Sequence, residues 1–68
     1  MSVILHTTDC PKCSVLKQKL IEKNIEFTEN HNIDIKDMRA RGLMGAPILQ
    51  VGDVYMGFIA ANEWVKNQ

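Results

Sequence analysis

Two cysteines separated by two residues, in the segment Cys10-Pro11-Lys12-Cys13, are the residues of this chain best suited to chemistry. Disulfide exchange requires a thiolate, and a free cysteine with a pKa of about 8.5 is only slightly ionised at neutral pH. A redox role for this pair therefore requires surroundings that lower the pKa of one thiol.

The start of a helix provides such surroundings. Pro11 suits a first helical turn, because its missing N–H would have no partner there and its φ is already helical. Cys10 then lies at the N-cap or beside it, where free N–H groups and the helix dipole lower the pKa of a thiol. Lys12 adds a positive charge, whereas Asp9 adds a negative charge that opposes ionisation unless it points away. We predict moderate activation of Cys10.

The position of the second cysteine assigns the two roles. Cys13 lies one helical turn further on, close enough to reach the sulfur of Cys10 but more shielded from an incoming disulfide. The spacing predicts that Cys10 attacks first and that Cys13 resolves the mixed disulfide. A crosslink around so short a loop stabilises a fold little, which argues against a purely structural disulfide.

Zinc binding is the alternative use of this spacing, which also forms half of many zinc sites. His6 and His31 would complete four ligands, but they lie far apart in the sequence, and a structural zinc site usually draws its second pair from neighbouring residues. We expect His6 to be a polar tip at the end of the first strand and His31 to lie in a loop. A metal- or cluster-binding module that uses Cys10 and Cys13 without redox turnover remains the alternative, and no bound cofactor is predicted.

The elements around the cysteines form a pattern that positions them. The apolar run 3–5 predicts a strand covered on both faces. Residues 12–23 predict an amphipathic helix with Cys13, Leu16 and Leu20 on one face. Residues 25–28 alternate apolar and polar side chains, as in a half-buried strand, and a loop is expected over 30–32. A Cys-x-x-Cys motif in such a βαβ unit favours a redox centre.

A short helix is predicted next, and it begins at a capping residue. Asp34 can cap this helix, which runs to Arg41 and ends at Gly42. Ile35 and Met38 should face inward. Met44, in the loop that follows, is a candidate for contact with a protein partner.

The last third predicts a hairpin and a final helix. Residues 48–51 and 54–56 are strand-like and are separated only by Gly52-Asp53, which suits a two-residue turn. Over 60–66 the chain places Ala61, Trp64 and Val65 on one stripe that can cover the sheet. The expected order of elements is β-α-β-α-β-β-α.

Length and charge limit the possible functions. A chain of 68 residues has room for one core, so residues 1–68 are expected to form a single α/β domain. Eight basic residues balance eight acidic ones, which gives no overall field for nucleic acid or an anionic membrane. The apolar run 3–5 is too short for a membrane span or a signal peptide. We therefore expect a cytoplasmic monomer.

Two motifs carry a resemblance to a known family. The segment Cys10-Pro11-Lys12-Cys13 and the pair Ala46-Pro47, placed just before the hairpin, make the chain similar over nearly its whole length to glutaredoxins and their thioredoxin-like relatives. The resemblance implies a thioredoxin-like (glutaredoxin) fold, a mixed four-stranded sheet with helices on both faces. It implies a dithiol-disulfide oxidoreductase, an enzyme of electron transport and cell redox homeostasis. It also implies a cis bond before Pro47, which packs beside the cysteines, and a backbone at Ala46 that meets an extended substrate.

One segment departs from many glutaredoxins. Met56-Gly57-Phe58-Ile59-Ala60 lacks the second glycine and the polar residues that hold glutathione in that family. The pair Gly57-Phe58 is closer to the glutaredoxin-like redoxins that serve ribonucleotide reductase and are reduced by thioredoxin reductase. Arg39 and Arg41 could pair with a carboxylate of glutathione, although a solvated helix face is the favoured interpretation.

The resemblance also implies a set of partners. Substrates would be protein disulfides, including that of ribonucleotide reductase, or glutathione-mixed disulfides. They would contact Gly57 and Phe58 as well as the Ala46-Pro47 pair. Electrons would come from glutathione or from a thioredoxin-reductase-type flavoenzyme.

Overall fold

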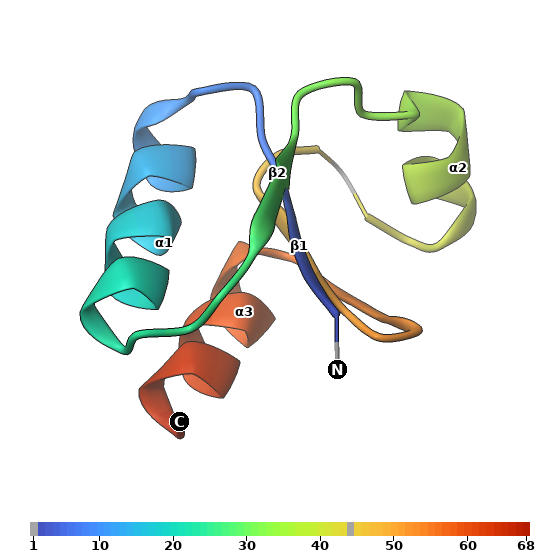
Figure 1. Cartoon of the computed structure of the whole chain (residues 1–68). Helices are drawn as coiled ribbons and strands as arrows, with labels where there is room; N and C mark the ends of the chain where they lie inside the picture. The colour runs from blue at the N-terminus through green and yellow to red at the C-terminus, as the bar shows by residue number, and fades with distance from the viewer. Residues whose placement is uncertain (1, 44) are drawn as a thin grey trace.

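The computed structural model describes residues 2–43 and 45–68, and within them the chain forms four strands and three helices in the predicted order (Figure 1). Met44 and its predicted partner contact lie outside the described residues. The elements are β1 (Val3–His6), α1 (Pro11–Glu22), β2 (Thr28–Asn30), α2 (Ile35–Ala40), β3 (Ile48–Val51), β4 (Val54–Met56) and α3 (Phe58–Lys66).

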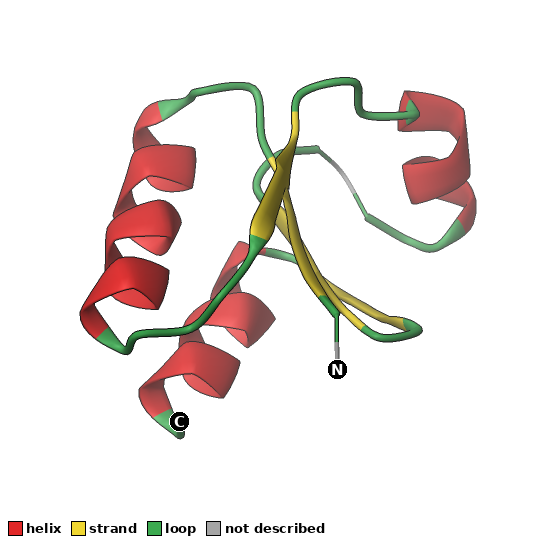
Figure 2. Ribbon diagram, viewed as in Figure 1, coloured by secondary structure: helices red, strands yellow, loops and turns green. Residues whose placement is uncertain are grey.

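The strands form one mixed sheet in the order β2-β1-β3-β4. β1 runs parallel to β2 and antiparallel to β3, and β4 is antiparallel to β3. Helices α1 and α3 lie on one side of this sheet and α2 lies on the other (Figures 1 and 2). The prediction of an α/β fold with a mixed four-stranded sheet is confirmed.

The main core lies between the sheet and the pair α1 and α3. Leu5 of β1 pairs with Leu49 of β3, so both side chains project from the same face of the sheet. Residues one and two turns apart on α1 and α3 cover that face, as the helical stripes predicted. The buried cluster consists of Leu5, Leu16, Leu20, Leu49, Val51, Ala61 and Val65. Trp64 packs against this cluster and is partly buried.

The second strand begins later than predicted. Ladder pairing starts at Thr28, opposite Ile4, and continues through Asn30, whereas the sequence predicted a strand over 25–28 and a loop from 30. The N–H of Ile25 donates to the carbonyl of Leu20 instead, because the chain is still turning away from α1 at that point. The alternation of burial is as predicted, since Ile25 and Phe27 pack against the core without joining the sheet.

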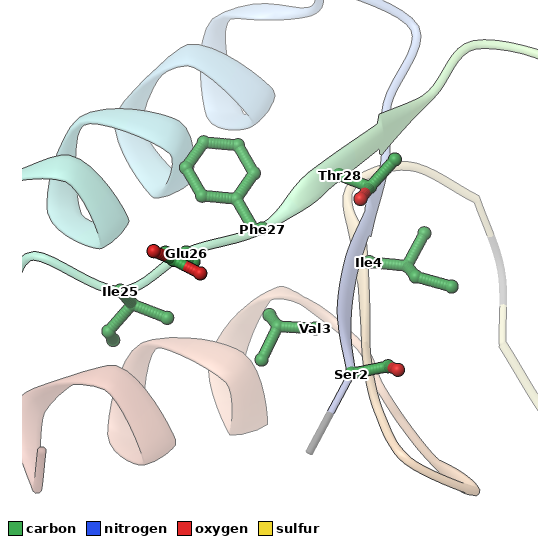
Figure 3. Close-up of a pocket in the computed structure, with 7 residues that line it drawn as sticks. All are labelled: Ser2, Val3, Ile4, Ile25, Glu26, Phe27 and Thr28. Atoms are coloured by element: carbon green, nitrogen blue, oxygen red, sulfur yellow. The ribbon is translucent and has the colours of Figure 1, made fainter.

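The late start of β2 leaves an open hollow beside the beginning of β1. Val3 and Ile4 line one side of it, and Ile25, Glu26 and Phe27 line the other (Figure 3). Cys10 follows the opposite end of β1, so this hollow is separate from the cysteine pair.

Helix α2 begins and ends as predicted but differs in one buried residue. The side chain of Asp34 accepts a hydrogen bond from the N–H of Asp37, and Gly42 follows with a φ of 81°, in the region that favours glycine. Met38 is buried, whereas Ile35 is 47% exposed and was wrongly predicted to face inward. Six residues make fewer than two turns, and Met38 is the one residue of α2 that is buried.

The hairpin has the predicted bounds, and the final helix is longer than predicted. Gly52 has a φ of 60°, which a two-residue hairpin turn requires. Helix α3 begins at Phe58, two residues before the predicted start, and Gly57 occupies its N-cap with an extended backbone. None of the helices in the described part of the chain is long and apolar enough to cross a membrane.

Candidate active site

Strand pairing brings the two sequence motifs to one end of the sheet. β1 ends at His6, which pairs with Ile48, the first residue of β3. The segment 7–10, which leads to the first cysteine, leaves the sheet at that end, and Pro47 enters the sheet there. The bond between Ala46 and Pro47 is cis, as the resemblance implied, and Pro47 is fully buried.

The start of α3 reaches the same end. β4 finishes at Met56, opposite Leu49 of β3, and continues into Gly57 and Phe58. The ammonium group of Lys12 lies 5.6 Å from the centre of the Phe58 ring, within the range of a cation–π contact. Two of the predicted site residues from distant parts of the sequence are therefore in contact.

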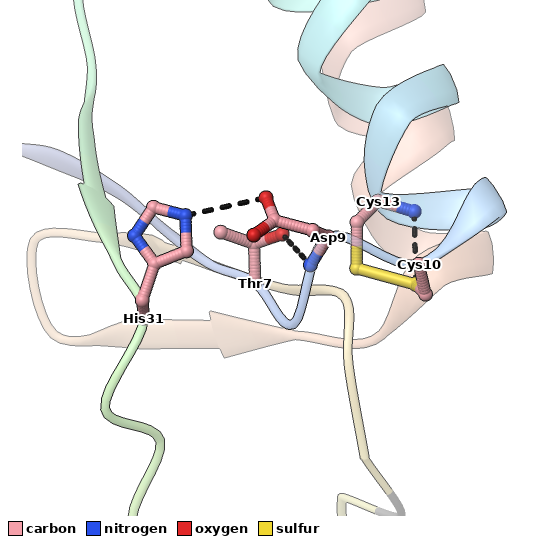
Figure 4. The surroundings of a disulfide bond; sticks show 5 residues. All are labelled: Thr7, Asp9, Cys10, Cys13 and His31. Atoms are coloured by element: carbon pink, nitrogen blue, oxygen red, sulfur yellow. Dashed lines mark hydrogen bonds and ion pairs between the residues drawn. A yellow bond between two sulfur atoms is a disulfide. The ribbon is translucent and has the colours of Figure 1, made fainter.

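Cys10 occupies the N-cap of α1, as predicted. Its backbone is extended, and the N–H of Cys13 donates to its Sγ over 3.1 Å (Figure 4). The N–H of Ser14 donates to its carbonyl oxygen over 3.0 Å. Pro11 takes the first helical position, where a backbone N–H would have no partner within the helix, so its missing N–H costs no hydrogen bond. The sulfur of Cys10 thus substitutes for the side-chain oxygen that usually caps a helix.

The two cysteines differ in accessibility and are joined by a disulfide. Cys10 is partly exposed, whereas Cys13 is only 1% exposed. The first turn of α1 therefore presents one sulfur to other molecules and shields the other. This difference fits the predicted roles of an attacking Cys10 and a resolving Cys13.

The loop before Cys10 is held by hydrogen bonds that the sequence did not reveal. The N–H of Thr7 donates to the carbonyl of Asn30 over 3.0 Å, and the hydroxyl oxygen of Thr7 accepts the N–H of Asp9 over 3.0 Å. Asp9 has a φ of 59°, a left-handed conformation that aspartate adopts more readily than most residues. The residue immediately before Cys10 is therefore fixed in an uncommon conformation.

The carboxylate of Asp9 is turned toward His31. The distance from its Oδ1 to the Nε2 of His31 is 3.3 Å, and both side chains are well exposed (Figure 4). A protonated His31 would offset the negative charge of Asp9. In that protonation state, His31 from the loop after β2 would reduce the opposing effect of Asp9 on the ionisation of Cys10 that the sequence indicated.

Exchanging Asp9 for asparagine is expected to speed the alkylation of reduced Cys10 at pH 6, and exchanging His31 for alanine to slow it. The first change removes a nearby negative charge and the second removes its partner. Because both groups are exposed, each effect should be about two- to fivefold and should shrink at high salt. Iodoacetamide kinetics at two ionic strengths measure this. A slower Asp9→Asn variant would contradict the assigned effect of this charge.

His6 is the last residue of β1, as predicted, but its side chain is not the polar tip that the sequence predicted. It is buried, with 6% exposure, and its ring contacts Gln50 of β3 and Asn30 of β2. The prediction of a polar tip was wrong because β1 is an inner strand, so both neighbouring strands place side chains beside its last residue. His31 is exposed in a loop, as predicted.

The arginines of α2 and its C-cap lie apart from the cysteines. Arg41 donates from Nε to Oδ2 of Asp37 over 3.0 Å, and its guanidinium lies 3.9 Å from the centre of the Tyr55 ring. This hydrogen bond to the carboxylate of Asp37 raises the pKa of Arg41. Arg39 is exposed. The guanidinium of Arg41 is therefore engaged by Asp37 and Tyr55, on the side of the sheet that α2 covers.

Within residues 2–43 and 45–68, no three side chains of the His, Cys, Asp and Glu types are arranged to hold a metal ion. A comparison of the chain with protein-family models, with curated proteins and with solved structures gave no match.

Proposed function

We propose that this chain is a dithiol-disulfide oxidoreductase, a glutaredoxin-like electron carrier built on a thioredoxin-like fold. One observation carries the proposal. The accessible sulfur of Cys10 caps α1 and accepts the N–H of Cys13 over 3.1 Å, while the shielded sulfur of Cys13 is bonded to it. A helix start that holds one reachable sulfur beside one protected sulfur has the two parts that a disulfide exchange needs.

The N–H of Cys13 is central to the chemistry of the reduced form. In the reduced protein it can donate to a thiolate at Cys10, and hydrogen bonds to charged acceptors are about twice as strong as neutral ones. The dipole of α1 favours the same negative charge. Both effects lower the pKa of the Cys10 thiol below its ordinary value, so that more of it is reactive at neutral pH.

The proposed cycle transfers two electrons to a substrate disulfide. The Cys10 thiolate attacks one sulfur of the substrate, a new S–S bond forms, and the other substrate sulfur leaves as a thiolate. Cys13 then loses its proton and attacks the Sγ of Cys10, which releases the second substrate sulfur. The substrate is now a dithiol, and the protein carries the Cys10–Cys13 disulfide. Two molecules of an external thiol, which leave as their own disulfide, or a flavoenzyme then return two electrons and two protons to reset it.

The surroundings of Cys10 support a polypeptide disulfide as substrate. Ala46 lies just before Pro47 and Ile48 at the same end of the sheet, where its backbone could pair with an extended chain. Phe58 and Lys12 together offer an apolar ring and one positive charge. We propose protein disulfides, such as that of ribonucleotide reductase, or glutathione-mixed disulfides as substrates. A reducing cytoplasm would supply glutathione or a thioredoxin-reductase-type flavoenzyme as electron source.

Turnover of the oxidised protein with each reductant, measured side by side, tests this function. We expect NADPH oxidation with a thioredoxin-reductase-type flavoenzyme to exceed that with glutathione and glutathione reductase, because the segment 56–60 lacks polar side chains for glutathione. Faster turnover with glutathione would reverse the choice of reductant. Activity with neither would contradict the carrier function itself.

A further inference from the structure

A buried histidine at the end of β1 has both ring nitrogens engaged. Nε2 of His6 lies 3.0 Å from Oε1 of Gln50, and Nδ1 lies 2.9 Å from Nδ2 of Asn30. The ring also stacks on Tyr55, with the ring centres 6.1 Å apart and the planes 17° from parallel. Nothing in the proposed reaction uses this group, although it stands four residues before Cys10.

Backbone groups fix the orientation of both amide partners. Nε2 of Gln50 donates to the carbonyl of Gly52 over 3.0 Å, so its oxygen must face His6. The N–H of Asn32 donates to Oδ1 of Asn30 over 3.1 Å, so the Asn30 nitrogen must face His6. The histidine therefore donates from Nε2 and accepts at Nδ1, which defines a neutral ring with a single tautomer.

Asn30 connects this histidine to the cysteine loop. Its backbone carbonyl accepts the N–H of Thr7, and the hydroxyl of Thr7 in turn accepts the N–H of Asp9. Asp9 holds the left-handed conformation from which the chain enters Cys10. Three hydrogen bonds, linked through the residues Asn30 and Thr7, thus connect the ring of His6 to Asp9, the residue before Cys10.

We infer that His6 is a positioning residue for Cys10, acting through Asn30 and Thr7. The inference rests on the proposed function, because it concerns the reactivity of the Cys10 thiolate. The ring holds the Asn30 side chain through the hydrogen bond at Nδ1. This bond restrains Asn30, whose backbone carbonyl accepts the N–H of Thr7. A loop held in this way keeps the Sγ of Cys10 over the N–H of Cys13. When the hydrogen bond between His6 and Asn30 is lost, the Sγ of Cys10 spends less time near the N–H of Cys13, and the thiolate is less stabilised.

Three variants separate positioning from general stability. His6→Phe keeps an aromatic ring over Tyr55 but loses both hydrogen bonds. Asn30→Ala removes the link between the ring and the loop without touching the ring itself. Gln50→Ala is the matched control, since it leaves the Nε2–H of His6 without a partner but keeps the bond to Asn30.

The measurement is the pH profile of Cys10 alkylation in the reduced proteins, with thermal unfolding recorded alongside. The burial of Cys13 makes the fast phase report Cys10. We expect His6→Phe and Asn30→Ala to shift the midpoint upward and to slow alkylation at pH 6 by about three- to tenfold, the equivalent of one weakened hydrogen bond. Gln50→Ala should lower the unfolding temperature but keep the wild-type midpoint.

The outcomes distinguish this inference from the proposed function. A wild-type midpoint below that of a free thiol, with the same midpoint in His6→Phe and Asn30→Ala, overturns the positioning role and leaves the proposed function intact. A midpoint that moves as far in Gln50→Ala as in the others also overturns it, because destabilisation alone would then explain the shift. A wild-type midpoint equal to that of a free thiol overturns the proposed function. If His6→Phe does not fold, Asn30→Ala decides.

Discussion

Replacing Cys13 with serine is expected to leave the protein joined to a disulfide substrate through Cys10. The variant keeps the partly exposed thiol of Cys10 at the N-cap but has no second thiol to attack the mixed disulfide. Replacing Cys10 with serine should lower the exchange rate by about 10³-fold or more, as the loss of a nucleophile commonly does. Intact-mass measurement after incubation with a protein disulfide, without glutathione, should show the covalent complex for Cys13→Ser and none for Cys10→Ser.

Ser14→Ala is the matched control for this experiment, since Ser14 is an exposed neighbour on the same turn. It should turn over like the wild type and accumulate no complex. Adding glutathione to the trapped Cys13→Ser complex should release the substrate, because an external thiol can replace the missing one. Equal trapping by both cysteine variants would refute the assignment of attacking and resolving sulfurs.

The features that the sequence predicted correctly are those set by neighbouring residues. Pro11 and the helix that follows it place Cys10 at an N-cap, and the structure has this arrangement. The turn at Gly52-Asp53 determines the hairpin, whose strands have the predicted bounds. In both cases the decisive interactions lie within a few residues, so local patterns are sufficient.

The features that could not be predicted from the sequence depend on contacts between distant segments. Ladder pairing of β2 begins only where the chain comes alongside β1, at Thr28, and alternation alone could not locate that point. In α2 only Met38 is buried, and Ile35, three residues before it, stays 47% exposed. The burial of His6 depends on Gln50, 44 residues away, and on Asn30, 24 residues away. No pattern within the first strand indicates either partner.

In the candidate site, too, some features depend on neighbouring residues and others on contacts between distant segments. The roles that we propose for Cys10 and Cys13 were inferred from their spacing and from the predicted helix start at Pro11, and the structure has this helix start. The orientation of Asp9 could not be predicted, because it depends on its contact with His31 across the loop after β2. Local sequence was therefore sufficient to place Cys10 at the N-cap, whereas tertiary structure determines the charges and hydrogen bonds around it.

The helix that carries the cysteines is held in place by its buried face. Cys13, Leu16 and Leu20 lie on one stripe of α1 and are all buried, and the two leucines belong to the core cluster. Cys13 therefore lies on the same buried stripe as two residues of the core. Any loosening of this stripe would move both the shielded sulfur and the N–H that faces Cys10.

Shortening Leu16 to alanine is expected to destabilise the protein by about 2–5 kcal/mol, through lost burial and the cavity that remains. Leu16 is 0% exposed at the centre of the core cluster. A domain of this size has a total free energy of unfolding of roughly 3–10 kcal/mol, so this change removes much of it. Urea unfolding followed by the fluorescence of Trp64, the single tryptophan, measures the loss.

Val15→Ala provides the control, because Val15 precedes Leu16 on the same helix but is 46% exposed. Its cost should stay within about 1 kcal/mol, since most of its side chain already meets water. Helix propensity changes in the same direction in both variants, so the difference between them isolates burial. If both substitutions cost the same, α1 does not bury the face described here. The shielding of Cys13, and with it the division of roles between the two sulfurs, would then lose its structural basis.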